Sequence, residues 1–439
     1  MTARRKMPIH TQVFIALVLG ALAGVIAQAS IEPKALKDFA DNWAKPIGQI
    51  FVYGIFMVVV PLLFSALALG VSELGDIGKV GRVGIRSLIL TVVLSGIAVL
   101  IGLLAINIFN PANTLTVEKR EEIVQKFGNA EEAKKKIAAF EAAKLDDPPL
   151  FGFIPRNPLK EAVRALEGGL LPLMFFSLLF GLALASVEAE KGIAVKSFLE
   201  GLFAVSLKMI DFAMMFAPLG VFMLLFFAVS QLGAEVLLAL GLYVVLVLVA
   251  LATHQFLVYP MALKFIAKRN PWVFFRQIRT VMLTAFATSS SNATLPAALK
   301  SATDDVGLPR QISSFVLTVG ATANQNGTAL FEGITIIFIC GMFNVQLDLA
   351  QQFTVMLLAI VAGVGTAGVP GGSLPIIGLI LTRFQVPAEA IGLIFGVDRI
   401  LDMSRTVLNV TGDMTIATCV SAMEPEMEKE AAIEATASG

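Results

Sequence analysis

Long runs of apolar residues alternate with short polar segments along the chain, and this pattern predicts helices that cross a membrane. A helix needs about 20 consecutive apolar residues to span the hydrocarbon layer of a bilayer. The first run follows a short basic segment, as the apolar region of a signal peptide does. No clear small-residue cleavage site follows it ahead of a soluble domain, so we expect a membrane span there as well. The runs predict eight spans, at residues 12–29, 48–71, 86–109, 169–187, 197–229, 234–265, 308–340 and 386–420.

Two further apolar stretches, at 273–303 and 350–382, are interrupted by small and polar residues at their centres. The first contains Thr288 to Asn292, and the second contains the glycine-rich segment Gly363 to Ser373. Unpaired backbone is tolerated at membrane depth only where it is buried in protein or lines a wet cavity. The pattern therefore predicts two re-entrant helical hairpins, with two kinked spans as the alternative. Paired interruptions of this kind also mark the binding sites of transporters.

Composition excludes most soluble functions. The 439 residues are 56% hydrophobic and 15% charged, whereas soluble domains have roughly 25% charged residues. The basic and acidic residues balance to a net charge of zero, which argues against a nucleic-acid partner. Two cysteines and two histidines, far apart, give neither a disulfide framework nor a metal motif.

Positive charge predicts the orientation in the membrane. Lys and Arg cluster at the N-terminus, at 79–86, at 191–196 and at 264–279, and all four clusters fall on one side of the predicted topology. By the positive-inside rule this side is cytoplasmic, as are both termini. The two hairpins then enter from opposite sides, which suits an inverted repeat in the inner (plasma) membrane. The polar segment 111–168 is expected to be an exposed loop on the outside.

The last span carries five charged residues in an otherwise apolar helix, among them Asp398 and Arg399. Helical spacing places Asp402, Arg405 and Asn409 on one face, together with Asp398 and Asp413. Ionisable residues within a span usually face a functional interior. The alternative is a structural ion pair between Asp402 and Arg405.

The types of these residues suggest a ligand. The planar fork of Arg405 matches a carboxylate, and Asp402 can accept an ammonium group. The two together suit an acidic amino acid. In the preceding span, Gly320 to Thr328 is rich in Gly and Asn and predicts unwound backbone whose carbonyls could bind a cation, with charge from Asp413; a packing kink is the alternative.

At these residues the chain resembles the dicarboxylate/amino acid:cation symporter family of the glutamate transporters, and especially its prokaryotic aspartate and glutamate transporters. Four segments carry the resemblance, in the family's order: Ser289 to Pro296, Asn324 to Thr328, Gly365 to Gly371, and Asp402 to Asp413. The resemblance covers nearly the whole chain. It implies an all-α, polytopic, elevator-type transporter that forms a homotrimer in the lipid bilayer.

The resemblance also implies a division into domains. Residues 1–85 and 169–266 would form the scaffold. The third span, 86–110, and residues 267–420, which hold both hairpins and the last two spans, would form the transport domain. Residues 421–439 would be a flexible cytoplasmic tail.

The family's functional residues carry over by position. Arg405 would bind the side-chain carboxylate of the substrate and Asp402 its amino group. The full implied substrate site is Ser290, Ser291, Gln325, Thr328, Val369, Ser373, Asp402, Arg405, Thr406 and Asn409. A sodium site is implied at Gly320, Thr322, Asn324, Asn409 and Asp413.

Departures from the family concern the coupling ion. A second sodium site would use Thr91, Leu94, Ser95 and Asn326, but Asn326 replaces an aspartate and Leu94 replaces a hydroxyl residue. Leucine cannot bind a hard cation, which requires oxygen ligands, so we expect this site to be lost. Gln325 replaces a methionine and offers an amide in place of an ion. Arg399 is an added guanidinium, which could help to replace bound cations, snorkel, or pair with Asp398.

The sequence thus predicts a secondary active transporter of L-aspartate or L-glutamate whose sodium coupling is reduced or lost. Sodium or a proton would be the coupling ion, with no other cofactor. A fully sodium-coupled aspartate symporter and a C4-dicarboxylate transporter are the alternatives, and a channel or a binding-only receptor would be rivals of another class. No residue pattern predicts an enzyme.

Overall fold

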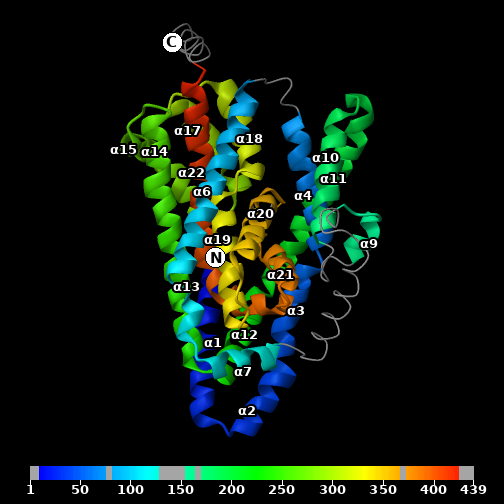
Figure 1. The fold of residues 1–439 in the computed structure, drawn as a ribbon, viewed down its shortest axis with the longest axis vertical. Helices are drawn as coiled ribbons and strands as arrows, with labels where there is room; N and C mark the ends of the chain where they lie inside the picture. Colours follow the sequence, from blue (N-terminus) through cyan, green and yellow to red (C-terminus); the bar gives the residue numbers. More distant parts are fainter. Residues whose placement is uncertain (1–8, 76–81, 128–153, 164–169, 366–371, 425–439) are drawn as a thin grey trace, which may run out of the picture.

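The computed structural model describes residues 9–75, 82–127, 154–163, 170–365 and 372–424. Throughout these ranges the regular structure is helical, and the described residues contain no strand. The helices run mostly along the long axis of the molecule (Figure 1). The all-α class predicted from the sequence is confirmed for this part of the chain.

The helix boundaries follow the apolar runs, with several runs divided into two helices. The π-helical segments are η1 (Ala40–Ala44) and η4 (His254–Val258), and the 3-10 segments are η2 (Pro111–Thr114) and η5 (Ala388–Leu393). The α-helices are α1 (Ile9–Ser30), α2 (Pro33–Phe39), α3 (Lys45–Phe56), α4 (Val59–Gly75), α6 (Arg82–Ile108), α7 (Val117–Phe127), α9 (Pro158–Val163), α10 (Leu170–Ser186), α11 (Ala189–Met215), α12 (Ala217–Leu232), α13 (Ala234–Thr253), α14 (Tyr259–Phe265), α15 (Pro271–Gln277), α16 (Arg279–Thr288), α17 (Ser291–Asp304), α18 (Arg310–Ala323), α19 (Asn326–Met342), α20 (Leu349–Gly365), α21 (Leu374–Arg383) and α22 (Phe395–Ala422).

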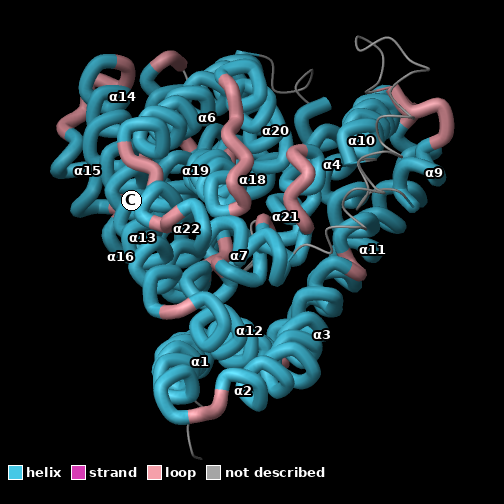
Figure 2. Tube along the Cα trace, turned by 60° about the horizontal axis from the view of Figure 1, so that its bottom comes forward, coloured by secondary structure: helices cyan, strands magenta, loops and turns pink. Residues whose placement is uncertain are grey.

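Helices of the first half form a partly separate assembly. α1 packs along α12, and α4 packs against α10 and α11. Gly20 permits the first contact, because a Cβ at that position would lie 2.6 Å from the carbonyl oxygen of Phe222. Both views show α9, α10 and α11 projecting to one side, away from α6, α18 and α22 (Figures 1 and 2).

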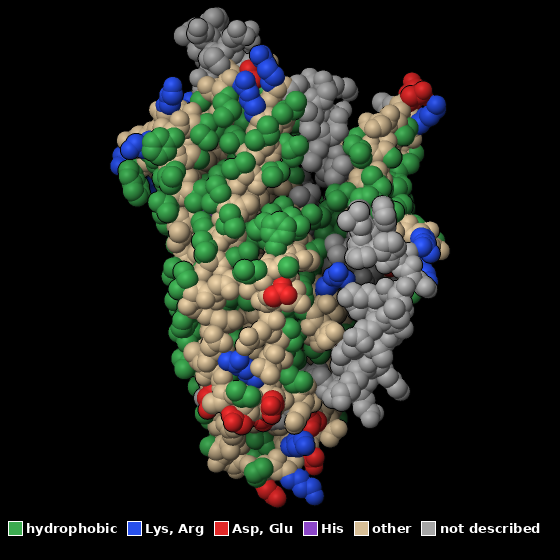
Figure 3. All heavy atoms as spheres, in the orientation of Figure 1, with side chains coloured by type: hydrophobic (Ala, Val, Ile, Leu, Met, Phe, Trp, Pro, Cys, Tyr) green, Lys and Arg blue, Asp and Glu red, His purple; other side chains and the backbone are tan. Residues whose placement is uncertain are grey.

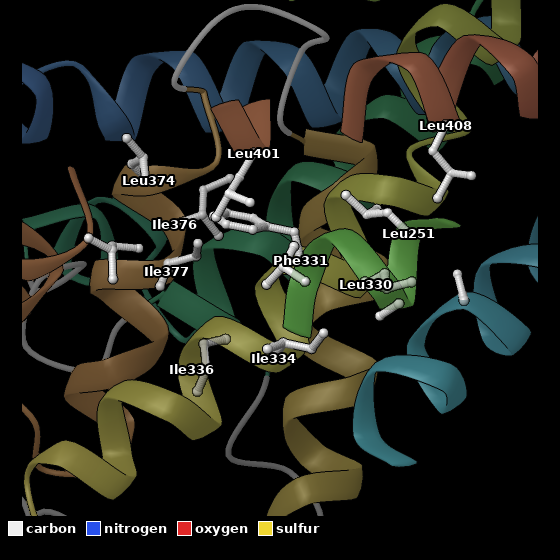
Figure 4. Packing of buried hydrophobic residues seen from close by; sticks show 14 of the residues in the cluster. Leu251, Leu330, Phe331, Ile334, Ile336, Leu374, Ile376, Ile377, Leu401 and Leu408 are labelled. Atoms are coloured by element: carbon white, nitrogen blue, oxygen red, sulfur yellow. The ribbon is translucent and has the colours of Figure 1, made fainter. Parts of the chain in front are cut away.

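The core of the second half is built around α19 and α22. α22 contacts α6, α13, α16, α17, α18 and α19. Phe331 and Ile334 of α19 pack among Leu401 of α22 and Ile376 of α21 (Figure 4), and all four side chains are buried. Nearly every residue of α19 is buried, so this helix lies within the protein.

Several apolar runs differ from the single spans that we predicted; the run at 48–71, for example, is divided between α3 and α4. The run at 197–229 is divided at Phe216, between α11 and α12; Pro218 in the first turn of α12 explains the restart, because its missing N–H is not needed there. The run at 234–265 is continuous but contains the π-helical segment η4 just before Pro260. Proline lacks a donor and clashes with the preceding turn, so the helix widens locally.

The interrupted stretches are also divided, at the positions predicted. α16 ends at Thr288, Ser289 takes a left-handed conformation with φ 52°, and α17 begins at Ser291. The Oγ atom of Ser290 caps α17 by accepting a hydrogen bond from the backbone N–H of Ala293 at 3.2 Å. In the second stretch, α20 ends at Gly365 and α21 begins at Leu374, and the tip at 366–371 lies outside the described residues.

Apolar surface is extensive on the long sides of the molecule. By length and composition, three described helical runs could cross a membrane: Thr11–Ser30, Arg82–Thr114 and Glu235–Phe265. Shorter apolar helices add to them, because breaks divide several predicted spans. Hydrophobic side chains cover much of the visible face, and charged side chains gather mainly toward its two ends (Figure 3). The number of membrane spans stays a prediction.

Candidate substrate and cation site

A buried polar stripe runs along α22, as helical periodicity predicted. Asp398, Asp402, Arg405, Asn409 and Asp413 are each at most 5% exposed. Thr406 is equally buried, and its hydroxyl donates to the carbonyl oxygen of Asp402 at 2.8 Å. Several charged side chains thus share one face of a helix at the centre of the protein.

Arg405 organises the charged end of this stripe. Its Nε and Nη2 atoms donate to Oδ1 of Asp402 at 3.0 and 2.7 Å, and its Nη1 atom lies 3.7 Å from Oδ1 of Asp398. The guanidinium also lies over the ring of Phe331, at 4.4 Å from the ring centroid. The ion pair with Asp402 therefore exists in this structure. Nη1 of Arg405 nevertheless has no hydrogen-bond partner within the described ranges.

Further unpartnered polar atoms lie at the ends of the interrupted helices. The hydroxyl groups of Ser289, Ser291 and Ser373 are buried and lack hydrogen-bond partners in the described part of the chain. Buried polar groups are normally satisfied, so such a set is typical of a site that binds a polar ligand. Ser290 differs from its neighbours because its hydroxyl caps α17. Val369 lies outside the described residues.

Three consecutive amide side chains hold the break between α18 and α19. Nδ2 of Asn324 donates to Oδ1 of Asp413 at 2.7 Å. Nε2 of Gln325 donates to the carbonyl oxygen of Ala321 at 3.0 Å. Nδ2 of Asn326 donates to the hydroxyl of Tyr259 at 3.0 Å. Each amide therefore supplies an N–H group to an acceptor beside the break. The unwound backbone that the sequence predicted at this point is confirmed.

Asn409 ties the break to α22. Its Oδ1 atom accepts from the backbone N–H of Gly327 at 2.7 Å, and its Nδ2 atom donates to Oε1 of Gln325 at 2.6 Å and to the hydroxyl of Thr328 at 3.1 Å. Gly327 is required here, because a Cβ would lie 2.5 Å from the carbonyl oxygen of Arg405. The structure thus brings Gln325, Thr328 and Asn409 together, as predicted.

Three residues of the implied sodium site, Gly320, Asn324 and Asp413, also lie together. A Cβ on Gly320 would lie 2.4 Å from Oδ1 of Asp413, so glycine lets this carboxylate approach α18. Beside them lies a cavity of about 70 Å³, lined in part by Asn324, Asp413, Thr91 and Ser95. The arrangement of acceptors around it could hold a small cation. Nothing is described for the side chain of Thr322.

Two residues of the second implied sodium site, Ser95 and Asn326, are joined by a hydrogen bond, and Ser95 and Thr91 also line the cavity. Ser95 donates through Oγ to Oδ1 of Asn326 at 2.5 Å, and Tyr259 donates through its hydroxyl to the carbonyl oxygen of Leu408 at 3.0 Å. Leu94 is buried and apolar. Tyr259 had not been singled out from the sequence, because it lies within the apolar run 234–265, which predicted only a span.

Glu332 of α19 is a second residue that the sequence analysis missed. Its side chain is fully buried, and both carboxyl oxygens lack hydrogen-bond partners among the residues described. It lies one turn after Thr328 and interacts electrostatically with Arg405. A single carboxylate in the apolar run 329–340 was the signal that could have identified it.

Comparison with known proteins identifies the family of the chain. The sodium:dicarboxylate symporter family matches residues 9–423. A proton/sodium-glutamate symport protein of Geobacillus stearothermophilus is 32% identical over 97% of both chains. A proton/glutamate-aspartate symporter of Escherichia coli is 28% identical over 98% of this chain and 95% of its own, and a C4-dicarboxylate transport protein of Bacillus subtilis is 28% identical over 97% and 95%. The chain belongs to the sodium:dicarboxylate symporter family of integral membrane transporters.

Proposed function

We propose that this symporter carries acidic amino acids, L-aspartate or L-glutamate, with its sodium coupling reduced or lost. The substrate class is supported by the buried pair of Asp402 and Arg405. A zwitterion with an extra carboxylate can replace this pair, because its carboxylate takes Arg405 while its ammonium takes Asp402. Each buried charge then keeps a partner, which avoids the large penalty of an unpaired charge. Relatives named as glutamate or glutamate-aspartate symporters support the same class.

The row of amides at 324–326 is the single observation that carries the change in sodium coupling. Broken helices in transporters expose backbone carbonyls that bound cations can satisfy. In this chain Gln325 donates to the carbonyl oxygen of Ala321 at the break, while Asn324 and Asn326 donate to the side chains of Asp413 and Tyr259 beside it. Asn326 also leaves the second implied site without a carboxylate. We therefore expect the break to keep its form without bound sodium.

A proton is the coupling ion that the charges favour. Among the residues that the structure describes, three carboxyl groups stand around Arg405, those of Asp398, Asp402 and Glu332, but only two guanidinium groups, those of Arg405 and Arg399. An excess carboxylate in the membrane interior is costly, so one of the three is expected to hold a proton. Glu332 is the candidate, because it alone of the three lacks a guanidinium within ion-pair distance in the described structure.

The elevator mechanism, the homotrimer and the orientation with both termini in the cytoplasm belong to this proposal. The projecting group of α9, α10 and α11 supports a scaffold separate from the core around α22 (Figure 2). α13 and α14 pack against α22, as α1 and α12 also do, but α13 in addition contacts α6 and α19. The resemblance implied that 169–266 belongs to the scaffold; the proposal instead assigns 234–265 to the transport domain, with 86–110 and 267–420, and keeps 1–85 and 169–233 as scaffold.

A C4-dicarboxylate transporter is the second candidate. Arg399 favours it, because this guanidinium lies beside Asp402, where a substrate ammonium would bind. A relative named as a C4-dicarboxylate transport protein is consistent with it. A fully sodium-coupled aspartate symporter is favoured by Asp413 and its neighbours, which keep the acceptors of one cation site.

Uptake into proteoliposomes tests the proposal. We expect vesicles loaded with unlabelled L-aspartate to accumulate labelled L-aspartate by exchange, which a channel or a binding-only receptor would not do. Net uptake should follow an imposed pH gradient and be nearly indifferent to a sodium gradient. Empty liposomes provide the background. Uptake driven only by sodium would refute the proposed coupling, and exchange of succinate but not of L-aspartate would refute the proposed substrate.

A further inference from the structure

Arg399 and Arg405 lie on either side of Asp402 on α22. Residues three positions apart on an α-helix are separated by about 60° around the helix axis. Residues 399, 402 and 405 are therefore neighbours on the helix surface, with the carboxylate between the two guanidinium groups. Nη1 of Arg399 lies 3.5 Å from Oδ2 of Asp402, and Arg405 donates to Oδ1. The two oxygens of one carboxylate are thus engaged by two different arginines.

The position of Arg399 shows that it belongs to the site. Its side chain is 17% exposed, and its Nε atom is buried without a hydrogen-bond partner in the part of the chain that the structure describes. Its ion pair is with Asp402, whereas no ion pair with Asp398 is found among the described residues. A long cationic side chain that merely reached for water would leave its guanidinium exposed. Here the guanidinium turns toward the carboxylate.

We infer that Arg399 sets the net charge of the substrate that this site prefers. By engaging Oδ2 of Asp402 it competes with a substrate ammonium for the same carboxylate. It also adds one positive charge beside the position of that ammonium, which favours an anion that lacks the ammonium. With Arg399 present, the affinity of the site for a C4 dicarboxylate such as succinate, relative to its affinity for L-aspartate, should therefore be higher than without Arg399. This inference rests on the proposed binding of acidic substrates by Asp402 and Arg405.

Two substrates that differ at this one group provide the probe. L-aspartate and succinate both carry two carboxylates on a four-carbon chain, and only L-aspartate carries an ammonium. Binding to the purified full-length protein in lipid nanodiscs is measured by calorimetry for both compounds, in the wild type, Arg399→Ala and Arg399→Lys. Arg310→Ala is the matched control, because Arg310 is an exposed arginine at the start of α18.

Arg399→Ala should raise the preference for L-aspartate over succinate by about tenfold or more, since a neighbouring charge of the same sign as the ammonium is removed at partly buried depth. Arg399→Lys should restore most of the wild-type ratio, and Arg310→Ala should leave it unchanged. A merely structural role would lower both affinities together and leave their ratio unaltered.

An unchanged ratio in Arg399→Ala, with both compounds still bound, would overturn the inference while leaving the proposed function intact. If the wild type bound neither compound, the proposed function would fail and the inference with it. Arg399→Gln, which keeps length and polarity without charge, replaces Arg399→Ala if the alanine variant does not fold, and the same change in ratio is expected.

Discussion

Ser95 of α6 donates a hydrogen bond to Asn326 of α19 at 2.5 Å, across 231 positions of sequence. The amide of Asn326 continues to the hydroxyl of Tyr259, which donates to the carbonyl of Leu408. This chain of contacts links α6, α19, α14 and α22 through neutral groups. A hydroxyl, an amide and a phenol thus make these links by hydrogen bonds between uncharged groups.

Restoring the missing ligands should restore a response to sodium. In the double variant Leu94→Thr/Asn326→Asp, a carboxylate and a second hydroxyl join Ser95, which gives the oxygen ligands that a hard cation needs. We expect L-aspartate to bind at least about fivefold more tightly in sodium than in choline, a typical coupling between two ligands. Calorimetry in the two salts measures the difference. Each single variant is the control, and a double variant indifferent to sodium would contradict this account of the site.

Tyr259 should contribute measurably to stability. Tyr259→Phe removes the acceptor of the Asn326 amide and a donor to Leu408 at a fully buried position, which should cost about 1–3 kcal/mol. Thermal unfolding in detergent would show this as a lower midpoint.

Tyr243→Phe is the matched control for Tyr259→Phe. It also removes a buried hydroxyl, but the partner, Thr335, still donates to the carbonyl oxygen of Phe331. Its loss of stability should be smaller. Equal losses in the two variants would mean that the Asn326 amide does not depend on Tyr259.

Asp402 should determine whether the substrate needs an ammonium. Asp402→Ser removes the carboxylate that would accept this group, and it frees Arg405 from its ion pair. We expect L-aspartate to lose at least about tenfold in affinity, since a charged hydrogen bond is worth about 1.5–3 kcal/mol, while succinate binding should hold or improve. Competition binding with both acids measures the shift. A parallel loss for both acids would place Asp402 in a structural role.

Glu332 should be needed for proton-driven transport but not for exchange. Glu332→Gln keeps the shape of the side chain and removes the group that can take up and release a proton. In proteoliposomes we expect net uptake driven by a pH gradient to fall to background while exchange of L-aspartate continues. Glu235→Gln, at an exposed position in α13, is the control and should retain both activities. If uptake by Glu332→Gln still follows the pH gradient, Glu332 is not the proton carrier, and the transported proton must bind to another carboxyl group.

Sequence periodicity was sufficient for the features that lie within one helix. The face of α22 that holds Asp402, Arg405 and Asn409 follows from the helical repeat alone. The break after Ala323 was signalled by glycine and asparagine in an apolar run. The break at Phe216 carried no such signal, because an aromatic residue fits an apolar span and only the following proline marks the restart.

Contacts between distant segments could not be read from the sequence. Tyr259 and Asn326 are 67 positions apart, and nothing local indicates that a phenol in one helix meets an amide in another. Arg399 was recognised as unusual, but its partner was not, because Asp398 and Asp402 are both within reach of a flexible side chain. Packing of α22 against its neighbours decides between them, and this depends on the whole fold.

Binding of L-aspartate to the purified protein, measured in sodium and in choline, tests the central claim most directly. The amides of Asn324, Gln325 and Asn326 hydrogen-bond to Asp413, to the carbonyl oxygen of Ala321 and to Tyr259, and we propose that these contacts hold the break between α18 and α19 without an ion. The account therefore predicts dissociation constants that agree within about threefold, which is below the range of about 5–150-fold typical of coupled ligands. An affinity that rises steeply with sodium would show that Asp413 and its neighbours still bind the cation, and it would contradict the loss of coupling.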